Sequence, residues 1–399
     1  MLSDRRRTHV IAGIAVLTGL GPALAQLSTQ PVTQAASAPA TRPDWPMFRG
    51  NPQLTGVAGS PLPEKLDVRW RYELGEGTSS TAAIVAGVVY VGADDGKFVA
   101  LDLQSGKPKW EFQTTDAIQS SPTIVGGLVI FGDEAGVVHA CDAQSGVERW
   151  SFKTDGRVIS SASPKEDRLV FGSYDGGLYC LRIADGGLIW KYDVGERVHG
   201  TPAIADDFVL VAACDGNLHV VRLGDGAPVR KVALGSVSGA AAAVRGSRVF
   251  LGTYGEQVLA LDWQAGQVLW RFEDPKRQFP FLSSAAVTDE LVIVGGQDKR
   301  LRGLEADTGK ERWQLAVKGK IDSSPVVVGQ RVFVGSADGN LYGVELKSGK
   351  EFWRFEAGGA ISASPAIGEG CLVVGTEEGV LYCFGEKPTV AARSFGAGR

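Results

Sequence analysis

The residues best suited to bind a ligand recur at one position along the chain, directly before a pair of small residues. Aligned there are Ser79, Gln119, Ile159, His199, Gly239, Leu282, Asp322 and Ser362. A calcium ion takes about six to eight oxygen ligands, several of them from carboxylates or amides. The position supplies only one carboxylate, so we predict no metal site. Gln119, His199 and Asp322 remain candidates for contact with a ligand or a partner.

The small pairs themselves contain many serines, which raises the question of nucleophilic catalysis. They include Ser120-Ser121, Ser160-Ser161, Ser283-Ser284 and Ser323-Ser324. No histidine and acid recur with them, as activation of a serine would need. We therefore interpret the pairs as small residues required where strands crowd together, and we predict no catalytic residue.

Two other groups of ionisable residues have a regular spacing that favours a structural role. His139 and His219 share the alignment position that tyrosines hold in other repeats. Asp102, Asp142 and Asp262 precede turns, where a carboxylate can accept hydrogen bonds from turn amides. A catalytic residue is needed once, whereas these recur. Hence we expect strand and turn positions rather than chemistry.

The number and spacing of the cysteines favour a structural role over a metal or redox site. There are five, an odd number, and no C-x-x-C pair occurs, so a metal or redox site is not indicated. We predict free and buried thiols. The cysteines are Cys141, Cys180, Cys214, Cys371 and Cys383.

The elements that position these residues are set by a repeat of about 40 residues, marked by tryptophan. The marking tryptophans are Trp70, Trp110, Trp150, Trp190, Trp270, Trp313 and Trp353. The doubled gap between Trp190 and Trp270 places Arg230 where a tryptophan is missing. Each unit holds four short β-rich runs separated by glycine-bearing turns, which is typical of a four-stranded antiparallel blade.

The units share the string Ala-x-Asp-x-x-x-Gly-x-x-x-Trp. It is complete at Asp102-Gly106-Trp110, at Asp142-Gly146-Trp150 and at Asp262-Gly266-Trp270. Four-stranded units of this length predict a β-propeller.

This string resembles the tryptophan-docking motif of the quinoprotein-like (PQQ-like) eight-bladed β-propellers. The family holds quinoprotein alcohol dehydrogenases and the non-catalytic outer-membrane assembly protein BamB. The resemblance extends from about Trp45 to Gly385 and includes the segment 44–50. It implies that each motif tryptophan packs between neighbouring blades.

The number of units and their ends predict how the ring closes. Eight opening strands can be counted, but the last unit stops near Phe384, before any Gly-x-x-x-Trp strand. A strand around Trp70 has no unit of its own. We therefore predict a single all-β, eight-bladed propeller of four-stranded antiparallel blades over residues 44–386, its last blade closed by the N-terminal strand. The seam beside Arg230 should be the loosest.

The two ends of the chain have the composition of segments outside a folded domain. A basic start, an apolar run of about eleven residues and a small-x-small exit at Ala25 predict a secretory signal peptide over residues 1–25. A disordered leader (26–43) and a flexible tail (387–399) are expected from composition. We therefore expect export to the periplasm or cell envelope, with no transmembrane span in the mature chain.

Charge and length narrow the choice of function. The net charge of −4 makes a nucleic-acid-binding protein improbable. We also expect the protein to be a monomer. The repeats are near minimal length except at residues 274–281, where Arg277 and Phe279 form a candidate partner surface. By resemblance, quinoprotein dehydrogenases also carry an acid/amide calcium cluster, many have a vicinal cysteine pair, and neither is found in this chain.

These observations favour a non-catalytic scaffold that binds a protein in the cell envelope and needs no cofactor. The resemblance to BamB implies a role in outer-membrane protein assembly. Two alternatives stay open. One is an oxidoreductase that uses pyrroloquinoline quinone with calcium. The other is a module that binds a glycan or small ligand in the channel.

Overall fold

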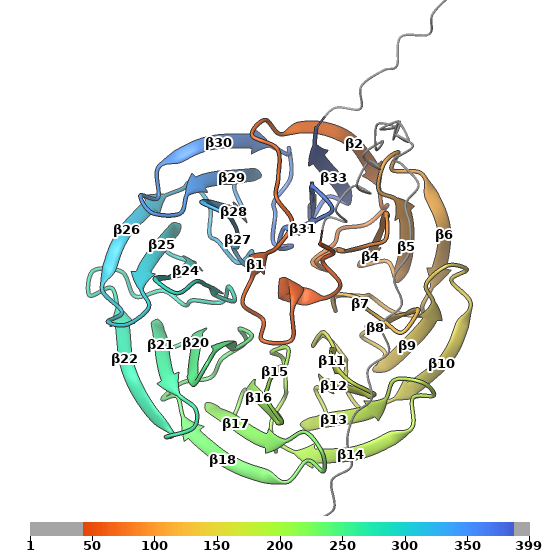
Figure 1. Ribbon diagram of the computed structural model, residues 1–399, viewed down its shortest axis with the longest axis horizontal. Coiled ribbons are helices and arrows are strands. Elements are labelled where there is room, and N and C mark those ends of the chain that lie inside the picture. The colour runs from red at the N-terminus through yellow and green to blue at the C-terminus, as the bar shows by residue number, and fades with distance from the viewer. Residues whose placement is uncertain (1–42, 387–399) are drawn as a thin grey trace, which may run out of the picture. The chain divides into compact units, whose positions relative to one another are not determined.

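The computed structural model describes residues 43–386, and in this part the predicted propeller is confirmed. Eight sheets of antiparallel strands stand as blades around a central axis (Figure 1). The expected signal peptide, nearly all of the leader, and the tail lie outside the described residues. Within residues 43–386, no helix is long and apolar enough to span a membrane.

Each blade is a meander whose first strand lies nearest the axis. The strands of blades one to four, in order, are β3 (Ala83–Val85), β4 (Val88–Gly92), β5 (Lys97–Asp102) and β6 (Pro108–Gln113); β7 (Thr123–Val125), β8 (Leu128–Gly132), β9 (Val137–Asp142) and β10 (Glu148–Lys153); β11 (Ser163–Lys165), β12 (Arg168–Gly172), β13 (Gly177–Arg182) and β14 (Leu188–Asp193); β15 (Ala203–Ala205), β16 (Phe208–Ala212), β17 (Asn217–Arg222) and β18 (Pro228–Ala233).

The remaining blades follow the same plan. Their strands are β19 (Ala243–Arg245), β20 (Arg248–Gly252), β21 (Gln257–Asp262) and β22 (Gln267–Glu273) in blade five; β23 (Ala286–Val287), β24 (Leu291–Gly296), β25 (Arg300–Glu305) and β26 (Glu311–Ala316) in blade six; β27 (Val326–Val328), β28 (Arg331–Gly335), β29 (Asn340–Glu345) and β30 (Glu351–Glu356) in blade seven; β31 (Ala366–Gly368), β32 (Cys371–Gly375), β33 (Val380–Gly385) and β2 (Asp67–Glu73) in blade eight.

The middle strands of each blade form the core. In blade one, β4 is buried at every residue and β5 at its four central residues. These strands are rich in valine and aromatic residues because both of their faces lie against neighbouring blades. The outermost strand β6 alternates between exposed and half-buried residues, since one of its faces meets solvent.

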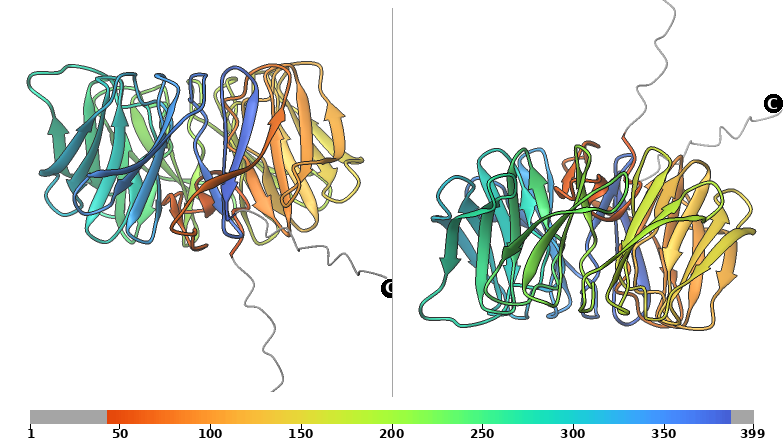
Figure 2. Two further views of the ribbon diagram at one scale, coloured as in Figure 1. Left: turned by 90° about the horizontal axis from the view of Figure 1, so that it is seen from above. Right: turned by 90° about the horizontal axis from the view of Figure 1, so that it is seen from below.

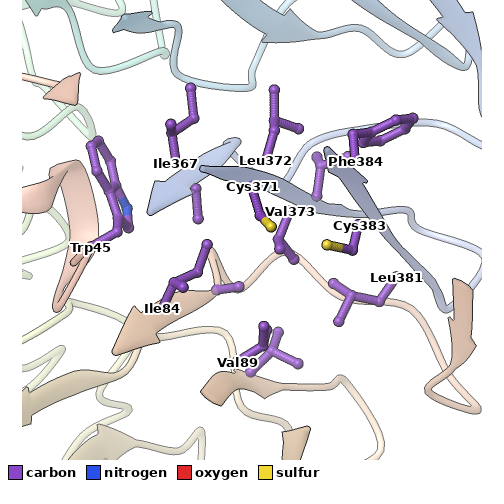
Figure 3. Close-up of a cluster of buried hydrophobic side chains, with 14 of the residues drawn as sticks. Trp45, Ile84, Val89, Ile367, Cys371, Leu372, Val373, Leu381, Cys383 and Phe384 are labelled. Carbon is purple, nitrogen blue, oxygen red and sulfur yellow. The ribbon is translucent and has the colours of Figure 1, made fainter. Parts of the chain in front are cut away.

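The ring is closed by pairing between strands from opposite ends of the chain. β2 runs antiparallel to β33, with Trp70 opposite Cys383 and Glu73 opposite Val380. Figure 3 shows the core at this closure, where side chains of blade eight such as Val373 and Leu381 belong to one hydrophobic cluster with Val89 of blade one. The predicted closure of the last blade by the N-terminal strand is therefore confirmed.

Residues 43–58 form an element that the sequence analysis did not predict, which we call the N-terminal plug. It contains the 3-10 helix η1 (Phe48–Gly50) and strand β1 (Val57–Ala58), which pairs parallel to β27. Figure 1 shows it curling across the centre of the ring, and Figure 2 shows it at one face.

The plug is held by backbone hydrogen bonds that follow the inner strands around the ring. Plug carbonyls accept the amide N–H groups of blades one, two, four, five, six, seven and eight, the donors being Ile84, Ile124, Ile204, Val244, Val287, Val327 and Glu369. The equivalent residue of blade three is Pro164, which has no amide hydrogen to donate. The plug thus ties seven blades to one segment.

The motif tryptophans join each blade to the next. The indole N–H donates to a backbone carbonyl of the following blade at 2.8 to 3.0 Å for Trp70, Trp110, Trp150, Trp190, Trp270 and Trp313. Trp353 packs edge-on against Phe384 instead. The outer strand of blade eight comes from the N-terminus, so that blade lacks the turn that the other tryptophans meet.

The motif glycine and aspartate shape the turn that receives each indole. Gly146 has φ of +72°, and a Cβ there would lie 2.6 Å from the ring of Trp110. Only glycine combines that backbone conformation with so close a contact. In the same turn, Asp142 Oδ1 accepts the amide N–H of Ser145 at 3.0 Å. Gly106 and Gly266, and Asp102 and Asp262, occupy equivalent places.

The seam between blades four and five lacks this contact. Arg230 lies over Gly266 where an indole lies in other blades, and its Nη1 reaches the carbonyl of Ala265 only at 3.5 Å. Arg230 is exposed, and β18 is exposed at all but one residue. Less apolar surface is buried at this seam than at its neighbours.

We therefore predict that amides of β18 exchange hydrogen faster than those of β6 around Trp110. Arg230→Trp should place an indole over Gly266 and raise the free energy of unfolding by roughly 1–2 kcal/mol. Urea denaturation and hydrogen exchange measure the two effects. Trp110→Arg is the matched control and should be destabilising. Equal protection of β18 and β6 in the unmodified protein would contradict the prediction.

Candidate functional site

The eight aligned residues that precede the small pairs meet around one cavity on the axis, which we call the central cup. It has a volume of about 240 Å³, and its lining includes all eight, from Ser79 to Ser362. Phe48 of the N-terminal plug also lines it. Gln119, His199 and Asp322, from three different blades, are therefore brought to one cavity.

A ring of hydroxyl groups lies next to these residues and is called the hydroxyl belt. Its members are Thr81, Ser121, Ser161, Thr201, Ser284, Ser324 and Ser364, all of which line the central cup. Each hydroxyl oxygen accepts the backbone N–H of the equivalent residue in the preceding blade, at 2.9 to 3.3 Å. The small residues thus link blades directly as well as fitting a crowded axis.

The first residue of each small pair has a different role. Ser120 Oγ donates to the carbonyl of Gly132 at 2.8 Å, and Ser323 Oγ donates to the carbonyl of Ala363 at 3.0 Å. These hydroxyls are buried and do not line the central cup. Within one pair, therefore, one serine fixes the backbone and the next faces the cavity.

His199 lies where the central cup meets a second cavity of about 270 Å³. Its Nδ1 is 2.6 Å from the hydroxyl oxygen of Tyr174, and Arg197 lies over the Tyr174 ring. Burial, together with the charge of Arg197, lowers the pKa of His199. The imidazole is therefore neutral at pH 7 and can donate or accept one hydrogen bond.

Asp322 is the only carboxylate among the residues that line the central cup, and it is already partnered. Lys320 Nζ lies 2.7 Å from Asp322 Oδ2, and the Gln297 side-chain amide donates to Oδ1 at 3.0 Å. The negative charge of Asp322 is therefore compensated by Lys320 at the rim of the central cup.

These residues do not fit a calcium-bound quinone. A calcium ion takes about six to eight oxygens, several from carboxylates, whereas the cup offers one carboxylate that lysine already holds. The volume of about 240 Å³ is also small against the roughly 300–1,000 Å³ of pockets for molecules of that size.

His139 and His219 occupy a strand position whose side chain contacts the aspartate of the preceding turn. His139 Nε2 lies 3.2 Å from Asp133, and His219 Nε2 lies 3.0 Å from Asp215. Tyrosine or arginine makes the same contact in other blades, where the pairs are Tyr179–Asp175, Arg302–Asp298 and Tyr342–Asp338. The two histidines lie outside the lining of the central cup.

The candidate partner residues Arg277 and Phe279 lie elsewhere, in the connection from β22 to β23. They line an open groove of about 730 Å³ together with Arg300, Glu311 and Gln314 of blade six. The base of the loop is fixed because Asp274 is 2.9 Å from Nη2 of the buried Arg302. Phe279, in the same connection, is 47% exposed.

All five cysteines are free, four of them buried and Cys214 partly exposed. In Figure 3 the sulfur atoms of Cys371 and Cys383 point toward each other. The hydrogen bond from the Cys383 thiol and the charge of Arg69 lower the pKa of Cys371. Arg69 Nη1 donates to Cys371 Sγ at 3.2 Å.

Comparisons with known proteins place the chain among propellers of one type. A family model described as outer membrane protein assembly factor BamB matches residues 67–196, 134–273, 219–342 and 316–387. The overlapping matches cover most of the chain without a gap. No curated protein sequence matches it.

Solved structures share the fold at low sequence identity. BamB from Moraxella catarrhalis is 21% identical with a TM-score of 0.69, and the match covers 81% of this chain and 98% of that one. The computationally designed Ika8 protein is 19% identical with a TM-score of 0.69, over 79% and 98%. A europium-containing methanol dehydrogenase is 14% identical with a TM-score of 0.71, over 86% and 98%.

The hydroxyl belt yields a stability prediction, because it is open at one junction. Blade five has Ala241 at the belt position, so the amide of Thr201 meets no hydroxyl there. Ala241→Ser should supply the missing acceptor and raise the free energy of unfolding by about 1 kcal/mol.

Urea denaturation measures the change. Ala241→Cys is the matched control, because a thiol has similar size but accepts hydrogen bonds weakly. If the serine variant is no more stable than the cysteine variant, the belt does not stabilise the ring as described.

Proposed function

The chain belongs to the family whose model is described as outer membrane protein assembly factor BamB, and from that premise we propose that it is a non-catalytic propeller that binds a protein partner in the cell envelope. The residues of the central cup support the absence of quinone chemistry, since they do not fit the cofactor. The signal-peptide pattern at the N-terminus supports export.

The observation that carries the proposal is the β22–β23 connection. It has twelve residues where the equivalent connections, such as β26 to β27, have nine. The extra length projects Phe279 beside an open groove. Exposed aromatics and arginines dominate the binding energy of protein interfaces. The loop therefore offers an anchor in a ring of otherwise uniform connections.

The groove is built to hold its shape. Arg302 is fully buried, pairs with Asp274, Asp298 and Glu311, and lies over the rings of Phe272 and Phe281. Phe281 is buried as well. A fixed base reduces the ordering cost of binding. The same groove is lined by charges of both signs, so a partner segment with both an apolar side chain and charges fits it. The charged residues are Glu273, Lys276, Arg277 and Glu311.

We predict that Phe279→Ala weakens partner binding at least tenfold, since truncation of a central aromatic anchor costs about 2 kcal/mol or more. A photo-crosslinking residue placed at position 276 should capture the partner in envelope extracts, and the affinity for the captured protein is then measured by calorimetry. Phe352→Ala is the matched control, because Phe352 is 40% exposed but lies on blade seven.

Unchanged affinity in Phe279→Ala, or an equal loss in Phe352→Ala, would contradict the assignment of the loop. Capture from position 352 but not from 276 would move the partner site to blade seven.

The competing hypothesis is a quinoprotein-like oxidoreductase, a class represented among the similar folds by a methanol dehydrogenase. We predict no heat on titration of the purified protein with pyrroloquinoline quinone and calcium, and no dye-linked oxidation of alcohols. Tight binding with turnover would overturn the non-catalytic proposal. Loss of that turnover in Asp322→Asn or His199→Gln would then place the reaction in the central cup.

A further inference from the structure

We propose that the central cup binds a small oxyanion, either a carboxylate or an inorganic anion such as phosphate. The site is the cavity bounded by the hydroxyl belt, the aligned rim residues and Phe48. The inference goes beyond protein binding by the Phe279 loop and does not depend on it.

The hydroxyl belt contains several hydrogen-bond donors that are not used within the protein. Each of its seven hydroxyl oxygens already accepts a backbone N–H. As donors, these hydroxyls have no acceptor among residues 43–386, although they are only 3–6% exposed. Buried donors need acceptors. A ligand that presents several oxygen acceptors would satisfy them together.

A buried positive charge lies next to two residues that line the central cup, Phe48 and Ser284, although its own side chain is not part of the lining. Arg49 follows Phe48 in η1 and is 1% exposed. Its Nη2 donates to the carbonyl of Ala285 at 3.0 Å, the residue directly after Ser284 of the belt. Gly56 makes room for the guanidinium, because a Cβ there would lie 1.8 Å from Nη2.

This charge has no counter-ion in the described part of the chain. Among residues 43–386, Arg49 forms no ion pair, and its Nε and Nη1 have no hydrogen-bond partner. The indole N–H of Trp45, also in the plug, is buried without a partner too. Burial lowers the pKa of Arg49 to about 9, which still leaves it protonated at pH 7. Uncompensated buried charge favours a nearby anion.

The rim of the central cup presents no unpaired negative charge that would repel an anion. Asp322, the one carboxylate lining the cup, is paired with Lys320 and hydrogen-bonded by Gln297. His199 and Gln119 are neutral and can donate one or more hydrogen bonds. A neutral polyol fits less well, because its own hydroxyl groups would need acceptors that the belt oxygens offer poorly.

Size limits the ligand. A volume of about 240 Å³ holds about eight water molecules, at about 30 Å³ each. Phosphate, sulfate, acetate and a short dicarboxylate such as succinate fall within this limit.

The experiment titrates the purified full chain, in a buffer with chloride as the only other anion, with phosphate, sulfate, acetate, succinate and glycerol in separate runs. Calorimetry and the shift of the melting temperature are the two readouts, since a ligand of the native state raises the melting temperature. We expect at least one oxyanion to bind and glycerol to give no signal. The comparison of phosphate with acetate and succinate decides which oxyanion chemistry the cup selects.

Matched serine variants locate the site. Ser121→Ala and Ser324→Ala each remove one hydroxyl that lines the cup, and each should raise Kd about 3- to 10-fold. Ser120→Ala and Ser323→Ala remove the neighbouring hydroxyls that face away from the cup, and should leave Kd within about twofold. Ala241→Ser adds a donor and should lower Kd.

The proposal is overturned if no oxyanion binds, if glycerol binds as well as phosphate and succinate do, or if both serines of a pair have equal effects on Kd. Because Ser121 and Ser324 are far in sequence from the Phe279 loop and line a different cavity, their variants should retain partner binding. Failure of one proposal is thus distinguishable from failure of the other.

Discussion

Each blade can bury its two apolar faces only against the neighbouring blades. The contact between an indole and a glycine turn sets how closely two neighbouring blades approach each other. The tryptophan of one blade covers the positive-φ glycine of the next, and its N–H finds a carbonyl in the same turn. The contact combines apolar burial with a satisfied donor, which lets a large aromatic lie at a seam. The recurring motif keeps this contact in register at most seams of the ring.

This dependence explains what could be predicted from the sequence. The string around Asp142, Gly146 and Trp150 recurs, complete or in part, because most seams use the same contact between an indole and a glycine turn, so the fold, the number of blades and the closing strand were predictable. The alignment also brought Gln119, His199 and Asp322 to one cavity, since equivalent residues of a ring face the axis together. In this fold each sequence repeat is one blade, and a rotation about the central axis relates it to the next blade.

The N-terminal plug could not be predicted in this way. It occurs once, and it is held by backbone carbonyls that meet amides such as those of Ile84 and Val244. Nearly every residue type has the same backbone amide and carbonyl groups, so these hydrogen bonds cannot be predicted from residue identity. One indirect signal existed, since Pro164 interrupts a column that holds isoleucine or valine in most other blades and marks the place where no donor is required. The belt was likewise visible only as small residues, because which neighbour a serine contacts depends on the curvature of the ring.

Closure by strands from the two ends of the chain has a consequence for folding. β2 pairs with β33 across about 300 residues of sequence, and the plug binds inner strands from blade one to blade eight. Contacts of such long sequence separation are slow to form, because loop-closure entropy is lost before they stabilise anything. β2 and the N-terminal plug cannot complete their pairing until blade eight has been made. Until then, the faces of blades one and seven that pack against blade eight stay exposed to solvent. The ring should therefore fold late and cooperatively, with the open arc as its most aggregation-prone intermediate.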